Sequence, residues 1–164
     1  FAAIQMAVVD PQGIYQEKIN FEVVDVVERS NEESPSLSNI LEAYQQDNFQ
    51  DALAFYGSLD NPTVKEHYIA AAAHLKLEAY QDAASIYQQI LDGNKVLNSM
   101  NYWEQRAAYN LAITNLQLNN YDEAIQILDQ LKSDEEYGVY YNQLVSDYAL
   151  WKLRLLGFKN SLFD

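Results

Sequence analysis

The fold is decided by "YNLAITNLQLNNYDEAIQIL", Tyr109–Leu128, because it repeats "YIAAAAHLKLEAYQDAASIY", Tyr68–Tyr87, which stands 41 residues earlier. Seven residues are identical at this spacing: Tyr68/Tyr109, Ala71/Ala112, Leu75/Leu116, Leu77/Leu118, Tyr80/Tyr121, Ala83/Ala124 and Ile86/Ile127. Each copy carries apolar residues three to four positions apart, interrupted once near its middle, as two short amphipathic helices would. The repetition therefore predicts a helix pair that occurs more than once.

A third copy lies upstream, in "LSNILEAYQQDNFQDALAFY", Leu37–Tyr56. Measured between the aromatic residues that follow each break (Phe49, Tyr80 and Tyr121), the spacings are 31 and 41 residues. These values bracket the 34-residue period of the tetratricopeptide repeat. The aromatic residue is expected to fill the angle between two helices. The small residues Ala52, Ala83 and Ala124 are expected to let the second helix approach the first closely.

Helix start and stop signals agree with this division. Four starts are predicted at Ser34-Pro35, Thr63-x-x-Glu66, Asn101-x-x-Glu104 and Ser133-x-x-Glu136, and Gly93 is placed as a C-cap glycine. We therefore expect the chain after residue 36 to be helical, within a TPR-like repeat domain over residues 34–164.

A family resemblance rests on "AYNLAITNLQLNNYDEAIQILDQL", Ala108–Leu131, which is similar to the tetratricopeptide repeat (TPR) consensus. Ala112 stands where the family has glycine, and Asn120 stands where it has aspartate. The resemblance covers Ser34 to Asp164, with "YYNQLVSDYALWKLRLLGFKNSLF" as the first helix of a fourth, truncated unit. It implies an all-α, right-handed α-α superhelix of about three helix pairs plus a terminal long helix, preceded by an irregular lead over residues 1–33.

Composition excludes several classes of function. The chain carries 24 acidic and 10 basic residues, a formal charge of −14, which repels phosphate backbones and anionic lipid heads. Nucleic acid is therefore not expected as a partner. None of the 5 glycines belongs to a phosphate-binding GxGxxG or GxxxxGK[ST] loop, and the chain has no cysteine. We expect no cofactor.

Two clusters of polar residues allow an enzymatic alternative. His67, His74 and Glu78 lie along one predicted helix, as ligands of a metal hydrolase could, but an HExxH motif or cysteine pair is absent. Packing between helices is the interpretation that we favour for both histidines. The "SDEEY" stretch, Ser133–Tyr137, gathers carboxylates at a predicted helix start, where the helix dipole and solvent stabilise them. We therefore expect a protein without catalytic activity and without a bound metal.

The TPR resemblance implies a concave groove lined from fixed positions of each repeat. Twenty such positions hold four bases and no acid, whereas the chain average, 20 × 24/164, predicts about three acids. The residues expected to contact a partner are Tyr44, Lys65, Tyr68, Lys76, Arg106, Tyr109, Asn110, Ile113 and Arg154. Asn110 is included because carboxylate-binding members of the family place asparagine and basic residues near such positions, although the full set is not matched.

The function expected from this groove is that of a scaffold which binds a protein or peptide. The partner is expected to be acidic or to offer a free C-terminal carboxylate. The alternative is a structural or oligomerising domain, since Tyr148, Trp151 and Leu155 would leave an apolar face on the last helix, through which a homo-oligomer could form.

A weaker resemblance links the chain to bacterial envelope proteins in which a membrane span precedes a few such repeats. The apolar stretch "FAAIQMAVV" at Phe1–Val9 is too short to cross a bilayer, so this part of the protein is not expected to contact a membrane directly. The resemblance places the protein on the periplasmic side of the cell envelope, with the cytoplasm as the alternative.

Overall fold

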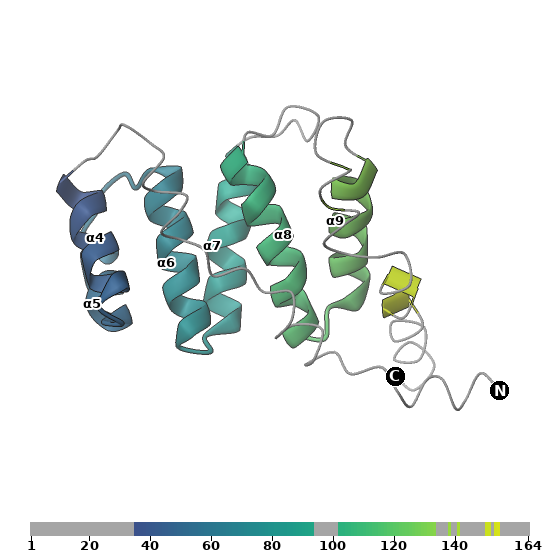
Figure 1. The fold of residues 1–164 in the computed structure, drawn as a ribbon, viewed down its shortest axis with the longest axis horizontal. Helices are drawn as coiled ribbons and strands as arrows, with labels where there is room; N and C mark the ends of the chain where they lie inside the picture. Colours follow the sequence, from purple (N-terminus) through teal and green to yellow (C-terminus); the bar gives the residue numbers. More distant parts are fainter. Residues whose placement is uncertain are drawn as a thin grey trace. The chain divides into compact units, whose positions relative to one another are not determined.

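The computed structural model describes residues 35–93 and 102–133, together with residues 138, 141, 150, 151, 153 and 154. The two continuous ranges form six helices and contain no strand: α4 (Pro35–Gln45), α5 (Phe49–Gly57), α6 (Val64–Lys76), α7 (Tyr80–Asp92), α8 (Tyr102–Gln117) and α9 (Tyr121–Ser133). The predicted all-α class is thus confirmed for this part of the chain (Figure 1). The predicted lead, residues 1–33, lies outside the described residues, as does most of the predicted fourth unit.

The described residues fall into two compact units that divide within α8, after Ala107. In the first unit α4 packs against α5, α6 packs against α7, and both α4 and α5 contact α6. Figure 1 shows these four helices as neighbours with roughly aligned axes, and the chain reverses between the two helices of each pair. The second unit contains the remainder of α8, the turn after it, and α9.

One turn geometry closes the first helix of each pair. After α4, the backbone N–H of Asn48 donates to the carbonyl of Ala43 at 2.9 Å, and that of Asp47 donates to Tyr44 at 3.1 Å. This is the hydrogen-bond pattern of the Schellman motif. The same two bonds recur after α6 (Ala79 to His74, Glu78 to Leu75) and after α8 (Asn120 to Asn115, Asn119 to Leu116). The repetition seen in the sequence is therefore a repetition of backbone structure.

The central residue of each turn has a left-handed backbone. Asp47, Glu78 and Asn119 have φ angles of 59°, 58° and 61°. Glycine usually occupies this position, because a Cβ atom raises the energy of the left-handed backbone conformation. Gly93, in contrast, is the C-cap of α7, as predicted, but its φ of −64° needs no glycine.

The next residue links the turn to the second helix. The carbonyls of Asn48, Ala79 and Asn120 accept hydrogen bonds from the N–H groups of Ala52, Ala83 and Ala124, at 3.0, 3.0 and 3.1 Å. All three alanine side chains are fully buried. Their predicted role is confirmed to this extent, because a larger side chain would meet closely packed atoms at these positions.

Two of the three aromatic residues after the turns, Phe49 and Tyr121, contact the segment that precedes them. The Phe49 ring lies edge-on to the Tyr44 ring, with 5.4 Å between centroids. The Tyr121 hydroxyl donates to Oδ1 of Asn119 at 2.7 Å and so holds the left-handed residue of its own turn.

The start of α6 is fastened to the start of α4. Thr63 and Glu66 form the predicted capping box, in which Thr63 N donates to the Glu66 carboxylate at 2.7 Å and Glu66 N donates to Thr63 Oγ1 at 3.3 Å. The buried Glu66 carboxylate also accepts a hydrogen bond of 2.6 Å from the Ser36 hydroxyl, in the first turn of α4. One carboxylate thus stabilises a helix terminus and connects two helix pairs.

Other predicted helix starts have different outcomes. Pro35 is the first residue of α4, as expected, and α8 begins at Tyr102. Ser133 is the last residue of α9, where its hydroxyl donates to the Gln130 carbonyl at 2.8 Å. The hydroxyl of Ser133 thus bonds to the helix that ends there. The other members of these signals, Ser34, Asn101 and Glu136, lie outside the described residues, as do residues 134–137 of the "SDEEY" stretch.

We expect the substitution Glu78→Gly to raise the free energy of unfolding by about 1 kcal/mol, because it removes the Cβ that makes a left-handed backbone costly. The matched control is Gln89→Gly, in the exposed face of α7, where glycine should lower stability by about 0.5–1 kcal/mol. Urea denaturation of both variants measures the difference. A Glu78→Gly protein less stable than the parent would show that the turn is not strained as described.

Candidate functional site

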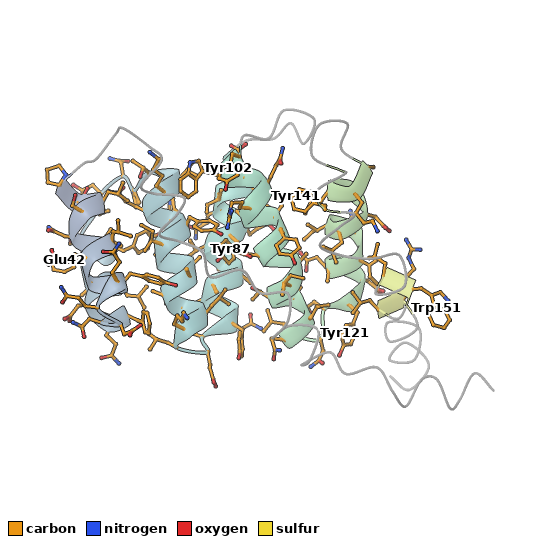
Figure 2. The ribbon with its side chains drawn as sticks, in the orientation of Figure 1. Glu42, Tyr87, Tyr102, Tyr121, Tyr141 and Trp151 are labelled. Carbon is orange, nitrogen blue, oxygen red and sulfur yellow. The ribbon has the colours of Figure 1, made fainter. Side chains whose placement is uncertain are left out.

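The main concentration of aromatic side chains in the first unit surrounds Arg106, and we call Tyr68, Tyr87, Tyr102, Trp103 and Arg106 the aromatic cluster. Tyr68 on α6 meets Tyr87 on α7 and Trp103 on α8 edge-on, at centroid distances of 5.7 and 5.5 Å. Trp103 lies 6.2 Å from Tyr102, again edge-on. Figure 2 shows Tyr87 beside the middle of its helix and Tyr102 at the N-terminal end of α8. Edge-on aromatic pairs stabilise the packing by more than the area that they bury.

Arg106 brings a positive charge into this cluster. Its guanidinium lies over the Tyr102 ring, 5.4 Å from the centroid, and Nη1 donates to the Tyr102 hydroxyl at 2.7 Å. Tyr68 is a second hydrogen-bond partner. Burial by itself lowers the pKa of Arg106. The hydroxyls of Tyr68 and Tyr102 raise this pKa by a larger amount, so the pKa of Arg106 lies above its ordinary value. The side chain therefore stays charged while half-buried.

Tyr44 lies near the same cluster, on α4. Its ring is buried, and burial raises the pKa of its hydroxyl, with further contributions from Tyr68 and Asp47. The hydroxyl has no hydrogen-bond partner among the described residues. Tyr44 is therefore neutral and packs in the core, where its ring contacts Phe49.

Five of the nine predicted partner-binding residues are packed inside the protein. Tyr44, Tyr68, Tyr109, Asn110 and Ile113 are each at most 6% exposed. Tyr109 lies 5.8 Å from Tyr141, ring to ring, and the backbone carbonyl of Asn110 accepts from the Thr114 hydroxyl at 2.7 Å. These five side chains offer no open surface in this structure. The periodic pattern that assigned them to a groove is also the pattern of helix–helix packing.

The four predicted cations are accessible to different degrees. Lys76 is exposed, while Lys65 and Arg106 are half-buried. Arg154 is exposed, but its Nη2 donates to both carboxylate oxygens of Asp129 on α9, at 2.9 Å to Oδ1 and 2.7 Å to Oδ2. Its charge is thus already compensated. Arg154 belongs to the second unit, and the other three cations belong to the first.

Charge is unevenly distributed within the first unit. Its described residues contain nine acids and three bases, and the bases are Lys65, Lys76 and Arg106. Lys65 and Lys76 are eleven residues apart, about three helical turns, and therefore lie on one side of α6. Tyr68, which follows Lys65 by three positions, shares that side and bonds to Arg106. On this side of α6 the residues between the two lysines, Ile69 and Ala72, are buried, so the lysines stand apart as separate charges near the two ends of the helix. We call Lys65, Lys76, Arg106 and the exposed Tyr102 the cationic face.

Tyr102 and Trp103 were missed by the groove pattern because they precede the position at which that pattern begins in the third repeat. A local signal for Tyr102 was present: it stands four residues before Arg106, the spacing at which side chains meet on a helix. The contact of Trp103 with Tyr68 depends on how α6 and α8 pack, and the sequence alone does not state it.

The two histidines have separate partners. The Tyr56 hydroxyl and His67 Nδ1 are 2.6 Å apart, which connects α5 to α6, and the Tyr56 ring lies edge-on to the imidazole. His74 lies 4.0 Å from the Asp82 carboxylate on α7. Within residues 35–93 and 102–133 and the six described residues after them, no group of three His, Cys, Asp or Glu residues could hold a metal ion. The imagined site at His67, His74 and Glu78 is therefore not assembled.

No helix in the described part of the chain has the length and apolar character needed to cross a membrane.

Burial lowers the pKa of both histidines below 6.5, although Glu66 and Asp82 partly oppose this effect. The two imidazoles therefore bind a proton more tightly in the unfolded chain than in the folded protein. The stability present above pH 6.5 should be lost as the pH falls through 6.5 toward the folded pKa values. NMR titration of the ring protons should give midpoints below 6.5 for His67 and His74 in buffer, and near 6.5 in urea. Folded-state midpoints above 6.5 would contradict the burial described.

Comparison of the chain with protein-family models, with curated proteins and with solved structures finds no match. The case for a function therefore rests on the repeated turn, the aromatic cluster and the cationic face.

Proposed function

We propose that the chain is a non-enzymatic scaffold of the TPR kind, a right-handed superhelix of helix pairs that binds a segment of another protein. The observation that carries this proposal is the threefold recurrence of one helix–turn–helix geometry, with the same two turn bonds and the same buried alanine. Stacked repeats bury their apolar faces against each other and present extended surfaces, and proteins built in this way commonly act as binding platforms.

The cationic face is the best candidate for contact with the partner. Lys76 and Tyr102 are exposed, and Arg106 stays charged beside an aromatic ring. A carboxylate near a guanidinium gains charge-assisted hydrogen bonds, and tyrosine supplies apolar contact with little loss of side-chain entropy. An acidic segment, or a chain end with a free carboxylate, fits this chemistry.

The buried tyrosines act as the support of that face. Tyr68 bonds to the Arg106 guanidinium, and Trp103 packs edge-on against both Tyr68 and Tyr102. These contacts hold the exposed Tyr102 and the half-buried Arg106 in place before a partner arrives. Preorganisation of this kind reduces the entropy lost on binding. The groove predicted from the sequence is thereby reduced to a smaller cationic surface on a rigid aromatic base.

The substitution Lys76→Glu should weaken binding of a labelled acidic peptide with a free C-terminus by several-fold, because it reverses an exposed charge on this face. Lys132→Glu on α9 is the matched control and should change the affinity less than twofold. Fluorescence anisotropy at two salt concentrations measures both effects, and binding should weaken as salt rises. Arg106→Glu is less informative, because the guanidinium is bonded to Tyr102 and Tyr68 and its loss would also lower stability.

A second candidate function, oligomerisation, is favoured by one observation. Trp151, a large apolar side chain of the second unit, is 43% exposed (Figure 2). Tyr148 and Leu155, which were expected to share its face, lie outside the described residues. A self-associating surface of this kind would make the second unit a structural element.

If this second function holds, sedimentation velocity should show a larger species as protein concentration rises, and Trp151→Glu should keep the protein monomeric. Arg154→Ala is a suitable control, because it removes the nearby ion pair with Asp129 and leaves the tryptophan in place. A single monomer peak over a hundredfold concentration range would rule out this candidate.

A further inference from the structure

The rings of the aromatic cluster form a path from the interior of the first unit to its surface. Tyr87 contacts Tyr68 at a centroid distance of 5.7 Å, and Tyr68 contacts Trp103 at 5.5 Å. Trp103 in turn contacts Tyr102 at 6.2 Å. These distances lie in the range at which aromatic rings touch. Tyr68 and Tyr87 are fully buried, Trp103 is half-buried and Tyr102 is 45% exposed, so the path ends at the solvent.

All four side chains on this path are oxidisable. In a chain without cysteine, tyrosine and tryptophan are the residues that lose a single electron most readily. The rate of electron tunnelling falls exponentially with distance, so rings in contact exchange an electron far faster than rings separated by other side chains. An electron vacancy that forms on one ring of the path therefore moves to the ring on which the radical is most stable.

Tyr102 is the residue on which the radical is most stable. Near neutral pH a tryptophan radical oxidises tyrosine, provided that the phenolic proton leaves as the electron does. The exposed Tyr102 releases this proton to water, whereas Tyr68 and Tyr87 are fully buried and have no such contact with solvent. Burial of an unpaired charge is costly, so a vacancy that cannot lose its proton is unfavourable in the core.

Arg106 favours the same end point. Its Nη1 donates to the Tyr102 hydroxyl oxygen at 2.7 Å, and its guanidinium lies 5.4 Å from the ring centroid. The positive charge repels a radical cation on that ring and stabilises the phenolate oxygen, so it favours loss of the proton. Arg106 itself stays charged and does not accept that proton, which passes to water.

We propose that Tyr102 is a site of one-electron oxidative modification, which is reached through Trp103. A one-electron oxidant, such as the azidyl radical, takes an electron from Trp103 and becomes azide, while the indole Nε1 proton passes to water. Tyr102 then gives one electron to Trp103 and its phenolic proton to water, and Trp103 regains a proton from water. The inference does not depend on the proposed binding function.

The product of this oxidation is a covalent link between two molecules. Two phenoxyl radicals, each on the Tyr102 of one molecule, form a bond between ring carbons, and the two displaced ring hydrogens move to the phenolic oxygens. The result is dityrosine, which is fluorescent. Its formation consumes one oxidant per molecule and leaves the backbone intact.

Pulse radiolysis in azide solution tests the relay. The variant Trp151→Phe is the starting protein, because Trp103 is then the remaining tryptophan of the chain. The azidyl radical oxidises indole preferentially near neutral pH, so the absorption of the tryptophan radical should appear first. That absorption should decay as the tyrosyl absorption grows, at a first-order rate that is independent of protein concentration.

Two further substitutions in this background identify the acceptor. Tyr102→Phe should abolish the conversion and the dityrosine that mass spectrometry finds at this position. Tyr80→Phe is the matched control, since Tyr80 is a partly exposed tyrosine of α7 outside the aromatic cluster, and it should change neither. The inference is overturned by conversion that survives Tyr102→Phe at an equal rate, by a rate that scales with protein concentration, or by the absence of any tyrosyl signal.

Discussion

The structure depends on a constraint at the end of each first helix, where the chain reverses within three residues. The reversal needs one residue with a left-handed backbone, two hydrogen bonds back to the helix, and an alanine small enough for the second helix to start against the first. None of these features is strong alone, and a non-glycine residue at the left-handed position is itself unfavourable. The burial on both sides of the turn outweighs that cost, so each helix pair is stable only as a packed unit.

Periodicity and capping are local properties, so several features could be predicted from the sequence. These are the helical class, the start of α4 at Pro35, the N-cap at Thr63 and the three buried alanines. The left-handed residues could not be read as readily. Asp47, Glu78 and Asn119 share no residue type, and the chemistry of the turn lies in backbone bonds rather than in side chains. Ser133 was misassigned for a related reason: serine bonds its own helix carbonyl as readily as it caps a following helix.

The candidate site shows the same limit. The repeat positions implied by the TPR resemblance assigned Lys65 and Lys76 to one groove, and their eleven-residue spacing puts both on one side of α6. Burial depends on the neighbouring helices, so the pattern could not separate tyrosines that support the surface, such as Tyr68, from a tyrosine that forms it, Tyr102. Arg154 illustrates a further case, since its pairing with Asp129 joins residues 25 positions apart in the chain. Such contacts are set by the packing of helices and have no local signature.

The three turns contain neither glycine nor proline, and this composition has a topological consequence. Gln46, Leu77 and Leu118 are good helix formers, and without proline the covalent chain permits a helix pair to straighten into one continuous helix. Straightening would also remove the energetic cost of the left-handed backbone in the turn. A straightened pair loses the apolar contacts between its two helices. A second molecule could restore these contacts by contributing its own helix. Two molecules that straightened at the same turn would exchange helices, which is the arrangement of a domain swap with the turn as its hinge.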